Sequence, residues 1–221
     1  MGRRPTYNNR MFPDIKMKRI LYILILLCAT TLCMHAQSRQ QMLDAISQAA
    51  AQTRDMECDF VQTKKIRLLN RNMVSSGMMS YRQPDKLRWE YQTPYAYVFV
   101  VNRNKVQILN NSRKDIIDAD KNKMFREIVN IMLGSVAGTC LSDESSFRTT
   151  VTVASGEYIA TLVPQKRELR QMFASIVLHF NPKQGVVVRI EMNESKGDIT
   201  VIELKNIRKN TDFNDSRFAV R

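Results

Sequence analysis

The sequence has few side chains suited to catalysis or metal binding. It contains two histidines in 221 residues, and only His179 lies beyond residue 36. No histidine or cysteine pair has the spacing of a zinc site, and no Gly-x-Ser-x-Gly elbow, phosphate-binding loop or dinucleotide fingerprint occurs. Neighbouring acids such as Asp143 and Glu144 stand where helices are expected to begin, a position that favours negative charge without any chemistry. The sequence therefore predicts a binding protein rather than an enzyme, with no metal and no cofactor.

Long hydrophobic runs are also scarce, and the one present lies near the N-terminus. Basic residues precede an apolar run from Ile20 to about Met34, which ends in small and polar residues after Ala36. This order is typical of a secretory signal peptide, and the run is shorter than the roughly 20 residues of a spanning helix. We therefore expect export to the periplasm, cleavage near Ala36 and a single domain over residues 37–221. Translation could begin at Met1 or Met17, and the sequence leaves both open.

The charge is strongly positive but is not concentrated. The formal net charge is +13, and removal of residues 1–36 would leave +8. Basic residues are scattered over expected turns and polar strand faces, and no common nucleic-acid-binding module occurs. This distribution argues against a focused nucleic-acid groove. It fits either a field that favours anionic membranes and acidic partners or a simply solvated surface.

Cysteine is rare as well. Cys28 and Cys33 fall in the expected signal peptide, which leaves Cys58 and Cys140 in the exported domain. The sequence cannot place their Cα atoms within bridging distance, so a disulfide and two buried thiols both remain open.

Most of the remaining chain alternates apolar and polar residues between turn signals. We expect eleven strands, at residues 56–68, 72–82, 85–92, 95–102, 105–109, 113–118, 147–154, 158–164, 173–180, 186–193 and 199–207. In the strand over residues 95–102 both faces are apolar, which predicts cover on both sides. His179 takes the face opposite its apolar neighbours and is expected to be exposed or paired locally.

Two helices and a helical turn interrupt this pattern. Apolar residues recur at helical spacing over residues 40–54, with Ser38 as the expected cap, and over residues 120–133, ended by Gly134 and Gly138. A shorter helical turn is expected over residues 166–172. The predicted fold class is α+β: a curved antiparallel sheet of about eleven strands that forms an unclosed β-barrel, with helices over its concave face.

The hairpin over residues 77–91 is the most informative stretch. Gly77, Met79 and Tyr81 share one face of its first strand, and Leu87, Trp89 and Tyr91 share one face of the second. Pro84 and Asp85 favour a turn between the strands. From periodicity alone this is an ordinary hairpin with one apolar face and one charged face.

The same residues also resemble a known family. An N-terminal amphipathic helix, the strand Cys58-Asp59-Phe60-Val61-Gln62-Thr63 and the hairpin Gly-x-Met-x-Tyr-x-x-Pro-Asp-x-Leu-Arg-Trp-Glu-Tyr are similar to the start of LolA, the family of periplasmic outer-membrane lipoprotein carriers. The later order of elements, a helical insert followed by hairpins closing on Phe218, is similar too. The resemblance implies a hydrophobic cavity under a helical lid, and a carrier that takes acylated lipoproteins from an inner-membrane ABC transporter. We expect a monomer.

The resemblance also implies a set of site residues. The expected acyl-chain cavity is lined by Phe60, Met79, Tyr81, Leu87, Trp89 and Tyr91, and by Met124, Phe125, Ile128 and Met132 from the lid. Methionine suits a cavity that holds mobile chains, although any one methionine can equally be core filler. We expect Leu87→Glu or Trp89→Glu to abolish ligand loading with the fold intact.

Two features depart from the family pattern. The best-studied members carry an arginine directly before the hairpin proline that holds the lid shut, and here that position is Gln83, with Arg82 one residue earlier. The expected latch therefore involves Gln83 or Arg82. The family's C-terminal extension has no counterpart after Phe218 in the expected strand pattern, which leaves the outer-membrane acceptor open. Two other functions fit the same fold: a carrier of another lipid or hydrophobic product, and a periplasmic sensor or regulator.

Overall fold

The computed structural model describes residues 40–69, 71–110 and 113–219. Met42–Arg221 forms one compact unit. The expected signal peptide over residues 1–36, its cleavage near Ala36 and the expected cap at Ser38 lie outside the described residues. No helix among the described residues is long and apolar enough to span a membrane.

Within the described ranges, eleven strands are found at the expected places, with ends within two residues of the predicted ones. Their bounds are β1 Asp55–Ile66, β2 Arg71–Arg82, β3 Lys86–Thr93, β4 Tyr97–Asn102, β5 Lys105–Asn110, β6 Arg113–Asp118, β7 Phe147–Ala154, β8 Glu157–Pro164, β9 Phe173–Asn181, β10 Val186–Glu194 and β11 Ile199–Lys209. More and less buried side chains alternate clearly along β3, β7, β8, β9 and β11, and turn residues bound the other strands.

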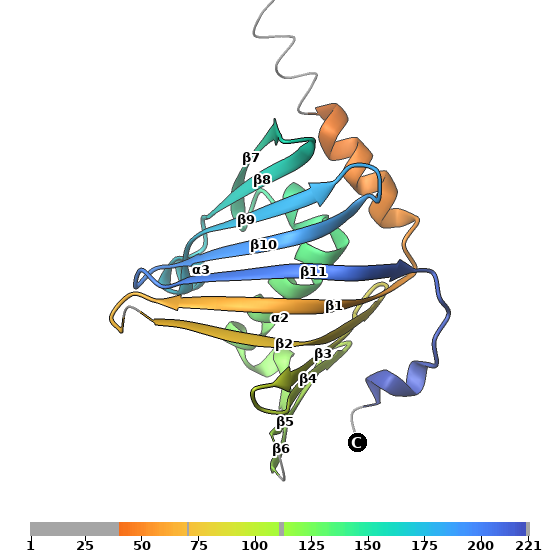
Figure 1. The fold of residues 1–221 in the computed structure, drawn as a ribbon, viewed down its shortest axis with the longest axis vertical. Coiled ribbons are helices and arrows are strands. Elements are labelled where there is room, and N and C mark those ends of the chain that lie inside the picture. The colour runs from red at the N-terminus through yellow and green to blue at the C-terminus, as the bar shows by residue number, and fades with distance from the viewer. Residues whose placement is uncertain (1–39, 70, 111–112, 220–221) are drawn as a thin grey trace, which may run out of the picture. The chain divides into compact units, whose positions relative to one another are not determined.

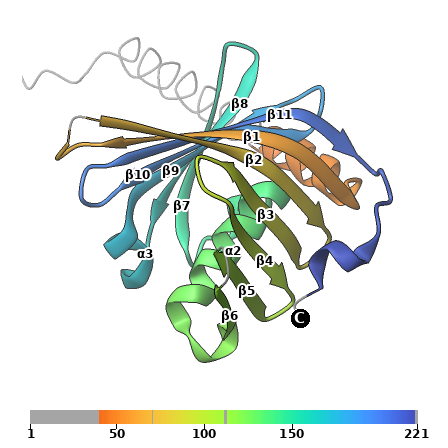
Figure 2. The same ribbon diagram turned by 60° about the horizontal axis from the view of Figure 1, so that its bottom comes forward.

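All strands join one antiparallel sheet. Its order is β6-β5-β4-β3-β2-β1-β11-β10-β9-β8-β7, so two meanders meet where β1 pairs with β11. The order begins with β6 and ends with β7, and the sheet curves strongly without closing (Figures 1 and 2). The predicted unclosed barrel is confirmed. Its concave face holds the main core, in which Phe60 pairs across the sheet with Leu204 and Gly77.

The hairpin of β2 and β3 turns at residues 83–85, as predicted. Near its open end the two strands come so close that side chains are excluded. A Cβ on Gly77 would lie 1.8 Å from the carbonyl oxygen of Glu90. Only glycine fits this contact, which coincides with a shift of register between Ser76 and Gly77.

The helix α2, Lys123–Ala137, lies inside the curve of the sheet (Figure 2). It follows the short 3-10 helix η1, Ala119–Lys121, and the side chain of Asn122 caps it by accepting a hydrogen bond from the Phe125 N–H at 3.2 Å. It ends at Gly138, which has a φ of 71°. The prediction that Gly134 also ends the helix is wrong. Gly134 lies within α2, where the chain after the helix packs against it. A Cβ on Gly134 would lie only 3.1 Å from the Cβ of Cys140.

Two further helices complete the inner side. A helix over residues 40–51 buries Ile46 in the core, and α3, Arg167–Met172, buries Leu169. The 3-10 helix η2, Thr139–Ser142, links α2 to β7 and buries Leu141. The helix α3 confirms the helical turn expected over residues 166–172.

The C-terminal segment over residues 210–219 lies on the outer side of the sheet. It contains the 3-10 helix η3, Asp215–Phe218, so the expectation that hairpins close on Phe218 is wrong: β11 ends at Lys209. Phe218 is fully buried, and its carbonyl accepts a hydrogen bond from the Asn102 side chain at 2.8 Å. This segment covers β4 from outside, where Val100 is buried, while Phe99 and Val101 join the inner core. The two apolar faces of β4 are thereby explained.

Candidate functional site

An apolar cavity of about 220 Å³ lies between α2 and the concave face of the sheet. It is lined by Gln62, Trp89, Tyr91, Ile128, Ile131, Met132, Ser135, Phe173, Ile190, Met192 and Ile202. Nine of these eleven residues are apolar or aromatic, so the cavity suits a hydrocarbon better than a polar ligand.

Strand pairing brings most of this wall together. Trp89 and Tyr91 point to the same face because they are two residues apart on β3. Gln62 of β1 pairs with Ile202 of β11, and Ile202 pairs with Ile190 of β10. The neighbouring strands β1, β11 and β10 therefore present one continuous wall opposite α2.

An aromatic cluster lies at the β3 side of the cavity, where Trp89 and Tyr91 line the wall and Phe60 and Tyr97 contact them. The ring of Phe60 lies 4.8 Å from that of Trp89 and 5.0 Å from that of Tyr91, and Tyr97 extends the group. The Tyr91 hydroxyl donates a hydrogen bond to the Gln62 side-chain oxygen at 2.9 Å. Burial raises the pKa of Tyr91 to about 12, with Tyr97 adding to the shift. The cavity wall thus carries no charge from this hydroxyl at neutral pH.

The structure separates the expected site residues into two groups. Trp89, Tyr91, Ile128 and Met132 line the cavity. The others lie elsewhere: Phe60, Met79, Tyr81 and Leu87 are buried in the core, Phe125 packs against the core, and Met124 is 50% exposed. An acid at Leu87 or Trp89 would bury a charge, so our expectation that such variants keep the fold intact does not hold.

Several lining residues were missed from the sequence. They are Gln62, Ile131, Ser135, Phe173, Ile190, Met192 and Ile202. Alternation showed which side chains of the C-terminal strands share a face. It did not show that β11 pairs with β1, and this pairing is what brings Ile190 and Ile202 beside Gln62.

The residues expected to latch the lid contact other segments. The Gln83 side chain donates a hydrogen bond to the carbonyl of Ala50 at 2.7 Å, at the end of the helix over residues 40–51. Ion pairs instead tie α2 to the region of α3: Lys166 lies 3.3 Å from the nearly buried Glu127, and Lys123 lies 2.6 Å from Glu168. Both pairs lie at the first turns of α2.

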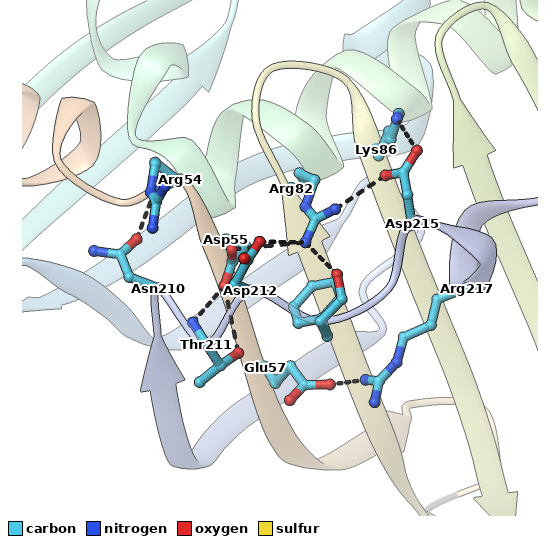
Figure 3. A network of polar contacts seen from close by, with 11 residues as sticks. Arg54, Asp55, Glu57, Arg82, Lys86, Asn210, Thr211, Asp212, Asp215 and Arg217 are labelled. Carbon is cyan, nitrogen blue, oxygen red and sulfur yellow. Dashed lines mark hydrogen bonds and ion pairs between the residues drawn. The ribbon is translucent and has the colours of Figure 1, made fainter.

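Arg82 fastens the C-terminal segment to the outer face of the sheet (Figure 3). Its guanidinium donates to the carbonyl of Phe213 at 2.5 Å and to Asp215 at 3.2 Å. It also lies 3.8 Å from the carboxylate of Asp55, a residue that is only 2% exposed. Thr211 completes the bonding of Asp55 by donating its N–H at 2.8 Å.

The ring of Phe213 stabilises the same attachment. The guanidinium groups of Arg82 and Arg217 lie 4.7 and 4.9 Å from its centroid, and Arg217 also pairs with Glu57. Contacts of this kind are attractive because the ring face is electron-rich. The charged outer face predicted for β2 and β3 is thus the binding surface for the chain's own C-terminal segment.

His179 is paired locally, between Glu157 at 3.0 Å and Glu191 at 3.3 Å. Among residues 40–69, 71–110 and 113–219, no group of three or more histidine, cysteine, aspartate or glutamate side chains could hold a metal ion.

Cys58 and Cys140 are free, buried thiols, so of the two open alternatives the structure contains the unpaired one. Cys58 lies on β1 opposite Met79, whereas Cys140 packs against Gly134 of α2. Burial raises the pKa of both thiols to about 12, with nearby Asp59 adding to the shift at Cys58.

We expect both thiols to be unreactive in the folded protein. Because the raised pKa leaves less thiolate at pH 8, alkylation of Cys58 and Cys140 should be at least about 100-fold slower than after unfolding in urea. Peptide mapping by mass spectrometry after timed alkylation measures each site separately. Equal rates before and after unfolding would contradict the buried positions.

Most of the chain matches one known protein family. The family model described as outer membrane lipoprotein carrier protein LolA matches residues 51–221. The chain belongs to the LolA family. A relative from Chromobacterium violaceum called outer-membrane lipoprotein carrier protein is 25% identical over 171 residues, which are 76% of this chain and 77% of the relative. One of the same name from Methylobacillus flagellatus is 25% identical over 154 residues, 67% of this chain and 69% of the relative.

Solved structures share the fold. The MucA/MucB complex of Pseudomonas aeruginosa contains a chain that matches with a TM-score of 0.51 at 12% identity, covering 83% of this chain and 61% of that chain. At this identity the likeness concerns the fold alone. It agrees with the unclosed sheet described above for this chain.

Proposed function

We propose that this protein is a periplasmic carrier that shelters the acyl chains of lipoproteins in the cavity under α2 and shuttles them from the inner to the outer membrane. It would act by binding alone, without catalysis and without a cofactor. The family match and the names of its relatives support the class of cargo.

The observation that carries the proposal is the composition of the cavity wall. Nine of its eleven lining residues are apolar or aromatic, and the Tyr91 hydroxyl already donates a hydrogen bond to the side-chain oxygen of Gln62. Each methylene withdrawn from water contributes about 0.8 kcal/mol, so five methylenes would contribute about 4 kcal/mol. The wall therefore supplies affinity without selecting any one polar head group.

The volume suggests how loading would proceed. A space of about 220 Å³ holds only part of a lipid, so a load with several chains requires α2 to move away from the sheet. The ion pairs Lys166–Glu127 and Lys123–Glu168 would then act as the closing contacts. A carrier of this kind needs only closed and open states that differ by a few kcal/mol.

The partners follow from this function. An inner-membrane ABC transporter would load the carrier, and an acceptor at the outer membrane would unload it. The carrier would work as a monomer, and nucleic acid would have no part in it.

The first test is to purify the protein from the periplasm of an expressing bacterium and to examine it by native mass spectrometry and lipid extraction. We expect an acylated peptide or lipoprotein to co-purify, in amounts above those found with an unrelated periplasmic protein prepared in parallel. If a different lipid were the only cargo found, the protein would be a carrier of that lipid and not of lipoproteins. A protein that is empty and takes up no fluorescent acylated peptide would contradict carriage altogether.

A further inference from the structure

The tip of the hairpin formed by β1 and β2 exposes a group of large apolar side chains. Leu68 is 92% exposed, Leu69 57%, Met73 53% and Val74 57%. They account for four of the eight exposed large hydrophobic residues found among the described residues, and they lie within seven positions of one another. Exposed apolar groups concentrated in this way commonly mark a binding surface.

Basic side chains predominate around this tip. Lys65, Arg67 and Arg71 are exposed there, and no acidic residue occurs between Asp59 and Asp85. The nearest acids lie on the adjoining turn between β10 and β11, where Lys64 pairs with Glu194 at 2.7 Å and with Asp198 at 3.7 Å. Lys196 is exposed on the same turn. The tip is therefore both apolar and cationic.

The tip also stands beside one end of the cavity. A second pocket, which shares Phe173 and Met192 with the cavity wall, reaches Ser195 and Lys196 in the turn between β10 and β11. The hairpin touches that turn, because the Arg67 N–H donates to Asp198 at 3.0 Å. A surface that met the tip would consequently lie close to this end of the cavity.

We propose that the hairpin tip is a docking site for an anionic lipid bilayer. Leu68 and Leu69 enter the interfacial region, while Lys65, Arg67 and Arg71 face the lipid phosphates. This combination of apolar and basic residues favours peripheral binding to anionic membranes. A protein partner fits less well, since a standard interface needs about 20 to 30 residues on each side and the tip offers fewer than ten. The site would operate whether or not the cavity carries acyl chains.

The test is co-sedimentation of the full chain with vesicles of phosphatidylcholine alone or mixed equally with phosphatidylglycerol. We expect binding to the mixed vesicles that weakens with added salt. Leu68→Ser with Leu69→Ser should lower the affinity at least tenfold. Lys65→Gln with Arg71→Gln should lower it about 25-fold, since each charge near an anionic surface is worth about fivefold.

Matched controls place the effect at the tip. Ile116→Ser with Val153→Ser removes two exposed apolar residues elsewhere, and Lys105→Gln with Lys114→Gln removes two exposed charges elsewhere. Both pairs should change the affinity less than about twofold. Every variant carries the same N-terminus, so any contribution of that segment to vesicle binding is equal in all of them. Differences in affinity among the variants therefore report the substituted side chains.

A fluorescent residue gives an independent readout. The sequence has a single tryptophan, Trp89, which is buried. Leu68→Trp should therefore give emission that shifts to shorter wavelength on mixed vesicles, whereas Ile116→Trp should not. Tip variants that bind as the parent does, or a parent that binds neither kind of vesicle, would overturn the proposal. Both results leave the test for co-purifying cargo unaffected.

Discussion

The variant Met132→Glu should lower the affinity for a fluorescent acylated peptide at least 100-fold while the protein stays folded. Met132 lines the cavity from α2 and is only partly buried, so a carboxylate there can reach water without unfolding the chain. It would nevertheless place a charge on the wall that an acyl chain must cover. Losing the burial of about four methylenes, near 3 kcal/mol, already exceeds a factor of 100.

The matched control for this variant is Met124→Glu. Met124→Glu introduces the same charge on the same helix. Met124 is half exposed, however, and does not line the cavity. Titration by fluorescence, together with circular dichroism to check folding, should show normal uptake for Met124→Glu and almost none for Met132→Glu. Equal uptake by both variants would mean that acyl chains bind elsewhere.

Replacing Arg82 by alanine should lower the free energy of unfolding by about 3 kcal/mol. The change removes a cation that faces the buried carboxylate of Asp55 and holds the carbonyl of Phe213 and the side chain of Asp215. Leaving a buried charge without its partner costs about 3 to 5 kcal/mol, and the bonds that Thr211 donates to Asp55 carry no compensating charge. Urea denaturation measures the loss.

Lys86→Ala provides the comparison, because Lys86 pairs with the same Asp215 at the more exposed end of the network. An exposed ion pair is worth about 1 kcal/mol or less, so this variant should be nearly as stable as the parent. Adding Asp55→Asn to Arg82→Ala should recover part of the lost stability, since it removes the unpaired charge. If Arg82→Ala and Lys86→Ala cost the same, the burial of Asp55 does not govern the attachment of residues 210–219.

Strand positions could be predicted because they depend on local alternation and on turn residues. Pro84 and Asp85 signalled the turn of the second hairpin, and both apolar faces of β4 signalled cover on both sides. The end of α2 could not be predicted as well. Gly134 is a helix breaker by propensity, but it is retained within α2 because Cys140 packs directly against it.

Site residues were predictable only where they lay near the informative hairpin or on the apolar stripe of α2. Trp89, Tyr91, Ile128 and Met132 were expected and line the cavity, whereas Met79 and Leu87 share the predicted face but lie in the core. Alternation says which face a side chain takes. It does not say whether another element fills the space above it.

The sequence by itself determined the strands, the helical segments, the family and the apolar character of the inner face, because each depends on local pattern or on motif. Only the tertiary structure decided that β1 pairs with β11, that the cavity wall crosses both meanders and that Arg82 binds the C-terminal segment. These contacts join residues more than 100 positions apart. No local periodicity encodes such pairings, because they result from how the whole sheet curves and packs.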